Sequence, residues 1–181
     1  MNDPANEHIR PRRSFIFTPG LKPEMFPKAL ASGADMVCIE LEDGVAPKDK
    51  DEARKNGLSL FEEPQAEDGV ERVVRINSMR SAYGIDDLQA ILASKTAPPG
   101  LMLPKVNSPE EVRWMDELLD ESGHACRLHI IIETNAGLEA AFEIAQSSPR
   151  IEALYFGGVD MSAELRCRNT WEPLHYARSR L

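Results

Sequence analysis

The stretch DMVCIELEDGVAPKDKDEAR, Asp35 to Arg54, changes within 20 residues from an apolar segment to a highly charged one. Its apolar run, Met36 to Leu41, is short and almost continuous, which is typical of a strand in a parallel sheet covered on both faces. A polar loop follows, and residues 48–61 have the composition of a charged helix. The stretch therefore predicts one strand–loop–helix unit, with three acids at residues 40–43 that need partners because an unpaired buried charge is costly.

The same unit recurs along the chain. The apolar runs are SFIF (14–17), MVCIEL (36–41), RVVRI (72–76), LMLP (101–104), HIIIE (129–133) and ALYFGG (153–158). Six such units in series predict an α/β fold, either an open doubly wound sheet or a barrel. The turn after the first run reads TPGLKPE rather than GxGxxG, and no Walker pattern occurs, which disfavours a nucleotide-binding version. A complete (β/α)₈ barrel would need two more units and about 250 residues.

Two of the helices carry specific signals. Ser108-Pro109-Glu110-Glu111 predicts a capping box with proline at the first helical position. Leu138, Phe142 and Ala145 lie at helical spacing and predict the apolar stripe of a later helix.

Composition excludes several classes of protein. The 181 residues carry a formal net charge of −9 with no basic stripe, so we expect no nucleic-acid partner. No apolar run approaches the roughly 20 residues that cross a bilayer, so we expect no membrane partner. Residues 1–12 lack the apolar core of a secretion signal and are predicted to be a flexible tail before a single domain, 13–181. Three scattered cysteines without a CxxC motif predict free thiols and a cytoplasmic protein.

Polar residues follow every predicted strand. In parallel α/β folds the ligand site lies at the carboxyl ends of the strands, so these residues are candidates for one common site. They are Thr18-Pro19-Gly20, Glu42-Asp43, Arg75 and Asn77, Pro104-Lys105, Glu133-Thr134-Asn135, and Gly158-Val159-Asp160.

Glu133 is the sharpest candidate, because HIIIET leads an apolar strand directly into a carboxylate. Glu133 and Asp160, with no histidine or cysteine beside them, predict a Mg²⁺ site, since this ion takes oxygen ligands and uses one or two carboxylates. Arg75 would bind a substrate carboxylate in a two-pronged grip. The alternatives are a structural salt bridge at Glu133, loop caps at Glu42 and Asp43, and a surface position for Lys105.

Seven segments in order resemble the citrate lyase β-subunit-like branch of the HpcH/HpaI aldolase/citrate lyase family. The resemblance runs from about Arg12 to the last residue. The segments are RRSFIFTPG, ADMVCIELEDGVAPKDKDEAR, VVRIN, LMLPKVNSPEE, IIETNAGL, LYFGGVDMSAEL and PLHYARSRL.

This resemblance implies a (β/α)₈ TIM-barrel fold, here truncated after about six βα units, and a Mg²⁺-dependent carbon–carbon lyase. Its substrate would be a 3-hydroxy-acyl thioester such as citryl-, malyl- or citramalyl-CoA, cleaved or formed through a metal-stabilised enolate. Glu133 and Asp160 would hold the metal, with Glu133 also facing the substrate. Arg75 would bind the oxo-acid. Glu42 and Asp43 would lie just outside the residues that contact the metal. The resemblance also places a further set toward the thioester and its phosphates: Thr18, Pro19, Gly20, Lys50, Arg54 and Lys105.

The chain departs from this family in two places. Glu40 stands where members usually carry aspartate, and the sequence ends at Leu181, inside the sixth expected helix. A longer natural protein, closure by another chain and a weakly active fragment are all compatible with that end. Open sheet edges also predict a homo-oligomer.

Three functions therefore stay open. The first is the lyase, with coenzyme A or an acyl-carrier protein as carrier. The second is a truncated or non-catalytic homologue that binds a partner or an acyl thioester without cleaving it. The third is a metal-dependent aldolase for free hydroxy-oxo acids, which ranks last because no histidine occurs between His8 and His124.

Overall fold

Six parallel strands form one sheet in the computed structural model, which describes residues 12–63, 65–66 and 68–181. Both ends of each strand lie within two residues of the ends of a predicted apolar run, so the predicted repeating unit is confirmed. The strands are β1 (Phe15–Pro19), β2 (Met36–Glu40), β3 (Glu71–Arg75), β4 (Gly100–Leu103), β5 (Arg127–Ile132) and β6 (Ile151–Phe156).

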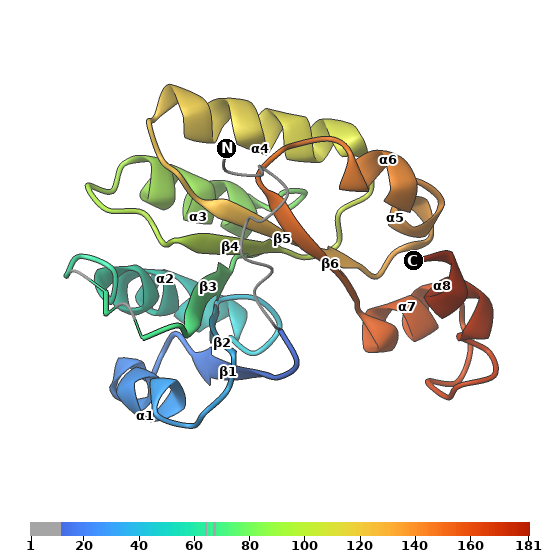
Figure 1. Cartoon of the computed structure of the whole chain (residues 1–181), viewed down its shortest axis with the longest axis horizontal. Helices are drawn as coiled ribbons and strands as arrows, with labels where there is room; N and C mark the ends of the chain where they lie inside the picture. The colour runs from blue at the N-terminus through green and yellow to red at the C-terminus, as the bar shows by residue number, and fades with distance from the viewer. Residues whose placement is uncertain (1–11, 64, 67) are drawn as a thin grey trace, which may run out of the picture.

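The strand order decides between the two predicted architectures. Neighbouring strands pair in the order β1-β2-β3-β4-β5-β6, without the reversal that defines a doubly wound sheet. This is the strand order of a (β/α)₈ barrel, of which the chain forms six consecutive units (Figure 1). Within the part of the chain that the structure describes, β1 and β6 each pair with one neighbour, and the sheet is open.

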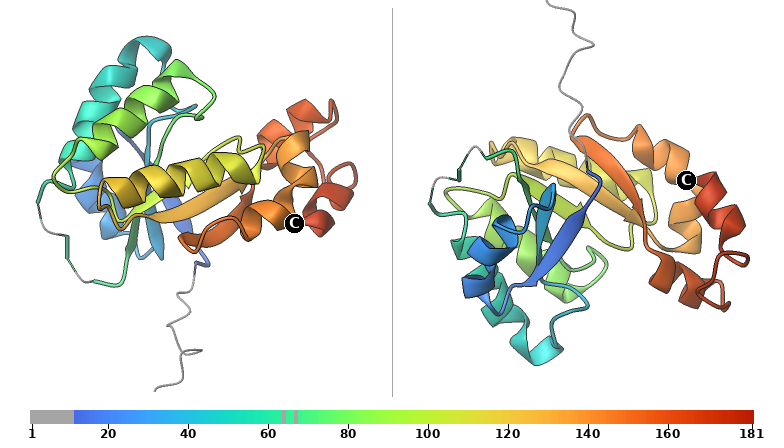
Figure 2. Two further views of the ribbon diagram at one scale, coloured as in Figure 1. Left: turned by 90° about the horizontal axis from the view of Figure 1, so that it is seen from above. Right: turned by 60° about the horizontal axis from the view of Figure 1, so that its bottom comes forward.

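Helices follow the strands and cover the outer side of the sheet. In Figure 1, α2, α3 and α4 follow one another along one side of it, and Figure 2 shows the same layer from two further directions. No helix among the described residues is both long and apolar enough to cross a membrane. The helices are α1 (Phe26–Leu30), α2 (Lys50–Ser59), α3 (Ala82–Leu92), α4 (Pro109–Glu121), α5 (Asn135–Glu139), α6 (Ala141–Ala145), α7 (Gly158–Glu164) and α8 (His175–Arg180), with short 3₁₀ turns η1 (Pro23–Met25) and η2 (Pro47–Asp49).

The two faces of the sheet have separate apolar clusters. Successive residues of a strand point to opposite faces, so alternate residues such as Val37 and Ile39 pack against the helices in the main core. The other alternate residues form a smaller inner cluster that includes Met36 and Cys38. By the same alternation Glu40 of β2 shares the inner face with Met36 and Cys38, at the carboxyl end of the strand.

Two helix predictions need correction. Ser108 is the N-cap of α4 and Pro109 opens the helix, as predicted, but the Ser108 side chain makes no capping hydrogen bond. Instead Glu111 accepts the backbone N–H of Asn107 at 3.3 Å. Phe142 is 61% exposed rather than buried. The chain breaks into α5 and α6 at residue 140, so the helical spacing between Leu138 and Phe142 no longer keeps them on one face.

The predicted tail also needs a new boundary. Residues 1–11 lie outside the described residues, but Arg12 is held at the amino end of the sheet. Its Nε lies 2.6 Å from Glu71 Oε2, and its Nη2 lies 2.9 Å from Glu152 Oε2. The buried His129 adds a second contact, with Nε2 at 3.2 Å from Glu71 Oε1. Arg12 is therefore part of the folded structure.

This cluster predicts a specific response to acid. Burial tends to raise the pKa of Glu71, but the partners His129 and Arg12 outweigh it and lower the pKa to about 2. A carboxyl group with a depressed pKa stabilises the fold above its unfolded pKa, and that contribution is lost as the pH falls from about 4.5 toward 2. We expect wild type to lose more free energy of unfolding than Glu71→Gln over this range, measured by urea denaturation. The exposed Glu117→Gln is the control, and equal losses in wild type and Glu71→Gln would contradict the account.

Candidate active site

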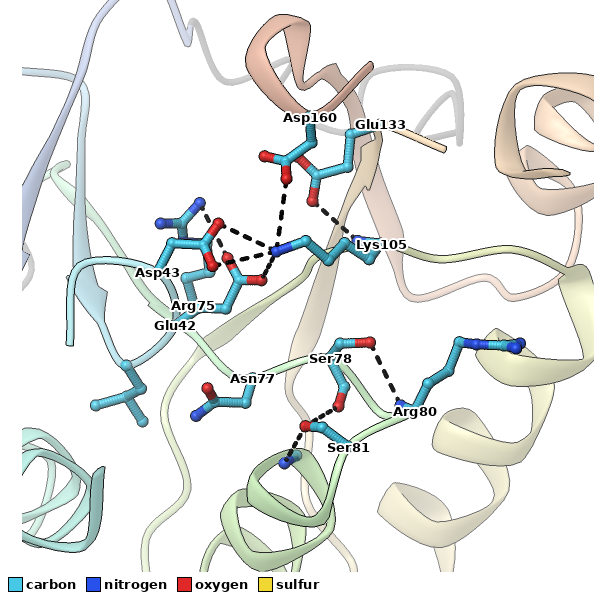
Figure 3. A network of polar contacts seen from close by, with 12 residues as sticks. Glu42, Asp43, Arg75, Asn77, Ser78, Arg80, Ser81, Lys105, Glu133 and Asp160 are labelled. Carbon is cyan, nitrogen blue, oxygen red and sulfur yellow. Dashed lines mark hydrogen bonds and ion pairs between the residues drawn. The ribbon is translucent and has the colours of Figure 1, made fainter. Parts of the chain in front are cut away.

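Five predicted site residues converge at the carboxyl ends of the strands (Figure 3). They come from the ends of four of the six strands, so the sequential strand order is what gathers them. Glu42 and Asp43 follow β2, Lys105 follows β4, Glu133 follows β5, and Asp160 lies in the first turn of α7, directly after β6. Figure 3 shows the carboxylates of Glu133 and Asp160 side by side above the Lys105 side chain.

Lys105 is the centre of this network. Its Nζ donates to Glu42 Oε1 and to Asp43 Oδ2, the latter at 3.1 Å, and lies 3.8 Å from Asp160 Oδ1. Its backbone N–H donates to Glu133 Oε1 at 3.0 Å. One residue thus contacts all four predicted acids. The family resemblance implies a position of Lys105 toward the thioester; in the structure its ammonium lies among the carboxylates.

The acids form a strongly negative, partly dry site. Glu133 is only 3% exposed, and burial raises its pKa to about 7, helped by the nearby charges of Asp160 and Glu42. Burial also raises the pKa of Glu42, although Lys105 and Arg75 oppose it. Buried carboxylates with raised pKa values beside one another are typical of a site that binds a cation.

Arg75 reaches the same site from β3, held by an acid of the neighbouring strand. Its Nε and Nη2 lie 2.7 and 2.5 Å from Glu40 Oε2, and its Nη1 lies 3.4 Å from Glu42 Oε2. Glu40 and Arg75 are register partners in the β2–β3 ladder, so the pairing follows from the sheet itself. The guanidinium also lies over the Phe17 ring, with Cζ 4.7 Å from the centroid. One edge of Arg75 is therefore occupied, and Nη1 is the nitrogen directed at the acidic site.

Two predicted thioester contacts have structural roles instead. Lys50 is buried, and its Nζ donates to Leu41 O, Glu42 O and Asn77 Oδ1 at 2.6–2.7 Å. An ammonium has three donors, so none remains for a ligand. Arg54 donates from Nε to the fully buried Asp87 at 2.7 Å. Lys50 therefore links the loops after β2 and β3, and Arg54 links α2 to α3.

A cavity of about 430 Å³ opens beside the acids. Its walls contain two residues with charged side chains and left-handed backbone, Lys105 at φ 54° and Arg166 at φ 53°. Thr18, Pro19 and Gly20, predicted to face the thioester, are not among its lining residues. The lining residues are Lys105, Glu133, Thr134, Asp160, Ala163, Glu164 and Arg166. Sequence reasoning missed Arg166, because nothing in LRCRNT indicates which arginine takes a left-handed conformation at a cavity.

The residues present fit a Mg²⁺ ion. Glu133 and Asp160 supply two hard oxygen ligands without a competing soft ligand beside them. Among the described residues, no group of three or more histidine, cysteine, aspartate or glutamate side chains is arranged to hold a metal. Mg²⁺ commonly binds through one or two carboxylates and keeps water or substrate in its other positions. The donor set therefore suits Mg²⁺ better than an ion that needs an all-protein cage.

Gly157 supplies a direct test of the Glu133 position. A Cβ at residue 157 would lie 2.6 Å from Glu133 Cβ and also against its carboxylate, so rotating the glutamate side chain alone cannot relieve the clash. A Cβ at Gly158 would meet its nearest neighbours at 3.5 Å, an ordinary contact. We expect Gly157→Ala to weaken Mg²⁺ binding at least tenfold in isothermal titration calorimetry, with Gly158→Ala close to wild type. Equal Mg²⁺ affinities for the two variants would show that Glu133 does not hold the ion.

Comparisons with known proteins show which family this chain resembles. The profile of the HpcH/HpaI aldolase/citrate lyase family matches residues 13–181. The mitochondrial citramalyl-CoA lyase of Homo sapiens is 30% identical, with 94% of this chain and 55% of that protein covered. The chain spans about half the length of the curated relatives it matches.

Solved structures show the same arrangement of elements. RipC from Yersinia pestis superposes with a TM-score of 0.80 at 35% identity, covering 96% of this chain and 70% of that one. CitE from Mycobacterium tuberculosis, solved in complex with magnesium, acetoacetate and coenzyme A, has a TM-score of 0.75 at 30% identity, covering 94% of this chain and 61% of that one. The match of the family profile extends over almost the whole sequence, and the chain belongs to the HpcH/HpaI aldolase/citrate lyase family.

Proposed function

We propose that this chain carries the metal and oxo-acid site of a Mg²⁺-dependent carbon–carbon lyase that cleaves or forms a 3-hydroxy-acyl thioester of coenzyme A. The observation that carries the proposal is the convergence of Glu133 and Asp160 beside a cavity, with Arg75 in contact with Glu42 of the same polar network. Citramalyl- or malyl-CoA is the expected substrate class, supported by the names of the relatives.

Each residue has a distinct expected task. Glu133 and Asp160 would hold Mg²⁺, which when bound would stabilise the negative charge that develops on the substrate oxygen during cleavage. Arg75 would orient the oxo-acid carboxylate through Nη1, while Glu40 keeps the guanidinium in place. Glu42 and Asp43 would lie just outside the residues that contact the metal, and both contact the Lys105 ammonium.

The acyl carrier, the oligomeric state and the cellular location are also proposals. The coenzyme A in the M. tuberculosis complex supports a thioester of coenzyme A rather than of an acyl-carrier protein. The open edges at β1 and β6 support a homo-oligomer. We propose a cytoplasmic protein without nucleic-acid partners, on the basis of three free cysteines and a net charge of −9.

Incubation with citramalyl-CoA or malyl-CoA tests the lyase. Cleavage of the bond between the α- and β-carbons of the thioester would give acetyl-CoA plus pyruvate or glyoxylate, which chromatography separates. We expect product with Mg²⁺ and none after chelation or with Glu133→Gln. The same assay with free 4-hydroxy-2-oxo acids tests the aldolase alternative, for which we expect no turnover.

A non-catalytic homologue remains the second candidate function. It is favoured by one observation, the coverage of only about half the length of the curated relatives. Binding of the thioester without any cleavage, in the presence of Mg²⁺, would support this candidate over the lyase.

A further inference from the structure

Lys105 has two features that the proposed function does not explain. It is a non-glycine residue with a left-handed backbone, at φ 54°. Its ammonium lies among acids, in contact with Glu42 and Asp43 and 3.8 Å from Asp160 Oδ1. We propose that this ammonium is the built-in counter-cation of the metal-free site, and that Mg²⁺ and the Lys105 ammonium exclude each other. The inference rests on the proposed function, because it uses the same metal site.

Lys105 provides a hydrogen-bond or charge partner for each of the four acids. Nζ bonds Glu42 and Asp43 from the loop after β2 and approaches Asp160 of α7 at 3.8 Å. The backbone N–H satisfies Glu133 Oε1 at the same time. Two of the acids, Glu42 and Glu133, are buried, and neighbouring buried carboxylates are unstable without a positive partner. The ammonium therefore lets the four acids stay close together before any metal arrives.

The backbone of Lys105 holds this arrangement in place. A left-handed conformation is unfavourable for a residue with a Cβ, and such residues persist only where surrounding contacts impose them. Here both ends of the residue are held by acids, the N–H by Glu133 and the ammonium by Glu42 and Asp43. The conformation is thus tied to the acids that it neutralises.

A Mg²⁺ ion bound to the same acids would neutralise them and repel the Lys105 ammonium. Mg²⁺ on Glu133 and Asp160 would bring a divalent charge next to a cation that already lies 3.8 Å from Asp160 Oδ1. Like charges at such distances repel, and they repel more strongly where water is excluded. The adjoining cavity gives the side chain space to move, since Lys105 and Glu164 both line it. The expected consequence is a lower Mg²⁺ affinity than the bare acids would have, together with a Lys105 side chain that moves when the metal binds.

Calorimetric titration with Mg²⁺ tests the exclusion. Lys105→Met removes the competing charge, and we expect it to bind Mg²⁺ at least tenfold more tightly than wild type. Lys95→Met is the matched control, because Lys95 is an exposed lysine away from the acids, and it should bind like wild type. Equal or weaker binding by Lys105→Met overturns the inference while leaving the proposed metal site intact. Failure of both wild type and Lys105→Met to bind Mg²⁺ overturns the metal site itself.

A labelling experiment on the wild-type protein tests the inference even if Lys105→Met does not fold. Wild-type protein is treated with an amine-acetylating reagent with and without Mg²⁺, and modification is measured per lysine by mass spectrometry. We expect Mg²⁺ to increase labelling of Lys105 several-fold relative to Lys95, and to have no such effect in Glu133→Gln. An unchanged Lys105 labelling rate in wild type at saturating Mg²⁺ would show that ammonium and metal coexist, which contradicts the inference.

Discussion

Glu133→Gln is expected to abolish Mg²⁺ binding and, at the same time, to stabilise the metal-free protein at neutral and alkaline pH. Glu133 is buried, and its pKa is raised from 4.5 to about 7 by desolvation and by the charges of Asp160 and Glu42. A carboxyl group with a raised pKa costs stability once it ionises, so the wild-type free energy of unfolding falls as the pH rises from about 4.5 through 7. Glutamine keeps the shape and an oxygen that accepts the Lys105 N–H, without the charge. Since one pKa unit corresponds to about 1.4 kcal/mol, the shift from 4.5 to about 7 gives an expected gain of about 3–4 kcal/mol at pH 8.5.

Urea denaturation of metal-free protein at pH 5 and pH 8.5 measures this gain. The advantage of Glu133→Gln should be present at pH 8.5 and largely absent at pH 5. Asp160→Asn is the matched comparison, because Asp160 is 37% exposed at its side chain and should lose Mg²⁺ binding with little gain in stability. A Glu133→Gln variant that is less stable than wild type at pH 8.5, or that binds Mg²⁺ normally, would contradict the account.

Arg75→Met is expected to be the most destabilising single change at the site. It leaves Glu40, which is 5% exposed, without its cation and also removes a positive neighbour of Glu42. Breaking a buried ion pair from one side typically costs about 3–5 kcal/mol, because the remaining charge stays buried and unpaired. We expect a loss in this range by urea denaturation at pH 7.

Two variants separate this cause from a general loss of packing. The double variant Glu40→Gln/Arg75→Met should recover a large part of the lost stability, since no unpaired charge remains at Glu40. Arg113→Met, which breaks an exposed pair with Glu110 within α4, should change stability by less than about 1 kcal/mol. A cost for Arg75→Met as small as that of Arg113→Met would show that the Glu40 pair contributes little.

The sequence could predict which side chains lie together where position in the strand decides their place. Parallel strands in sequential order bring their carboxyl ends to one edge, so a polar residue directly after an apolar run is placed by the sheet. Glu42, Glu133 and Asp160 follow their strands in this way, and Arg75 is the last residue of β3. The pairing of Glu40 with Arg75 also follows from register, because the two are direct partners across β2 and β3.

Long side chains and special backbone conformations were beyond sequence reasoning. Lys50 and Lys105 both follow strands and both carry flexible stems, yet Lys50 is buried on backbone carbonyls while Lys105 lies among acids. The left-handed φ of Lys105 decides its direction, and lysine carries no local signal for it. Phe142 was misplaced for a related reason, since a break at residue 140 divides one expected helix into α5 and α6.

The most direct test of the metal site is a crystal structure of the protein with Mn²⁺ in place of Mg²⁺, using the anomalous signal of manganese to locate the ion. We predict an anomalous peak that places the manganese ion within bonding distance of the carboxylates of Glu133 and Asp160. The Lys105 ammonium should then lie farther from Asp160. A manganese ion bound elsewhere, or an anomalous map without a peak between these two side chains at saturating Mn²⁺, would contradict the claim that they form the metal site.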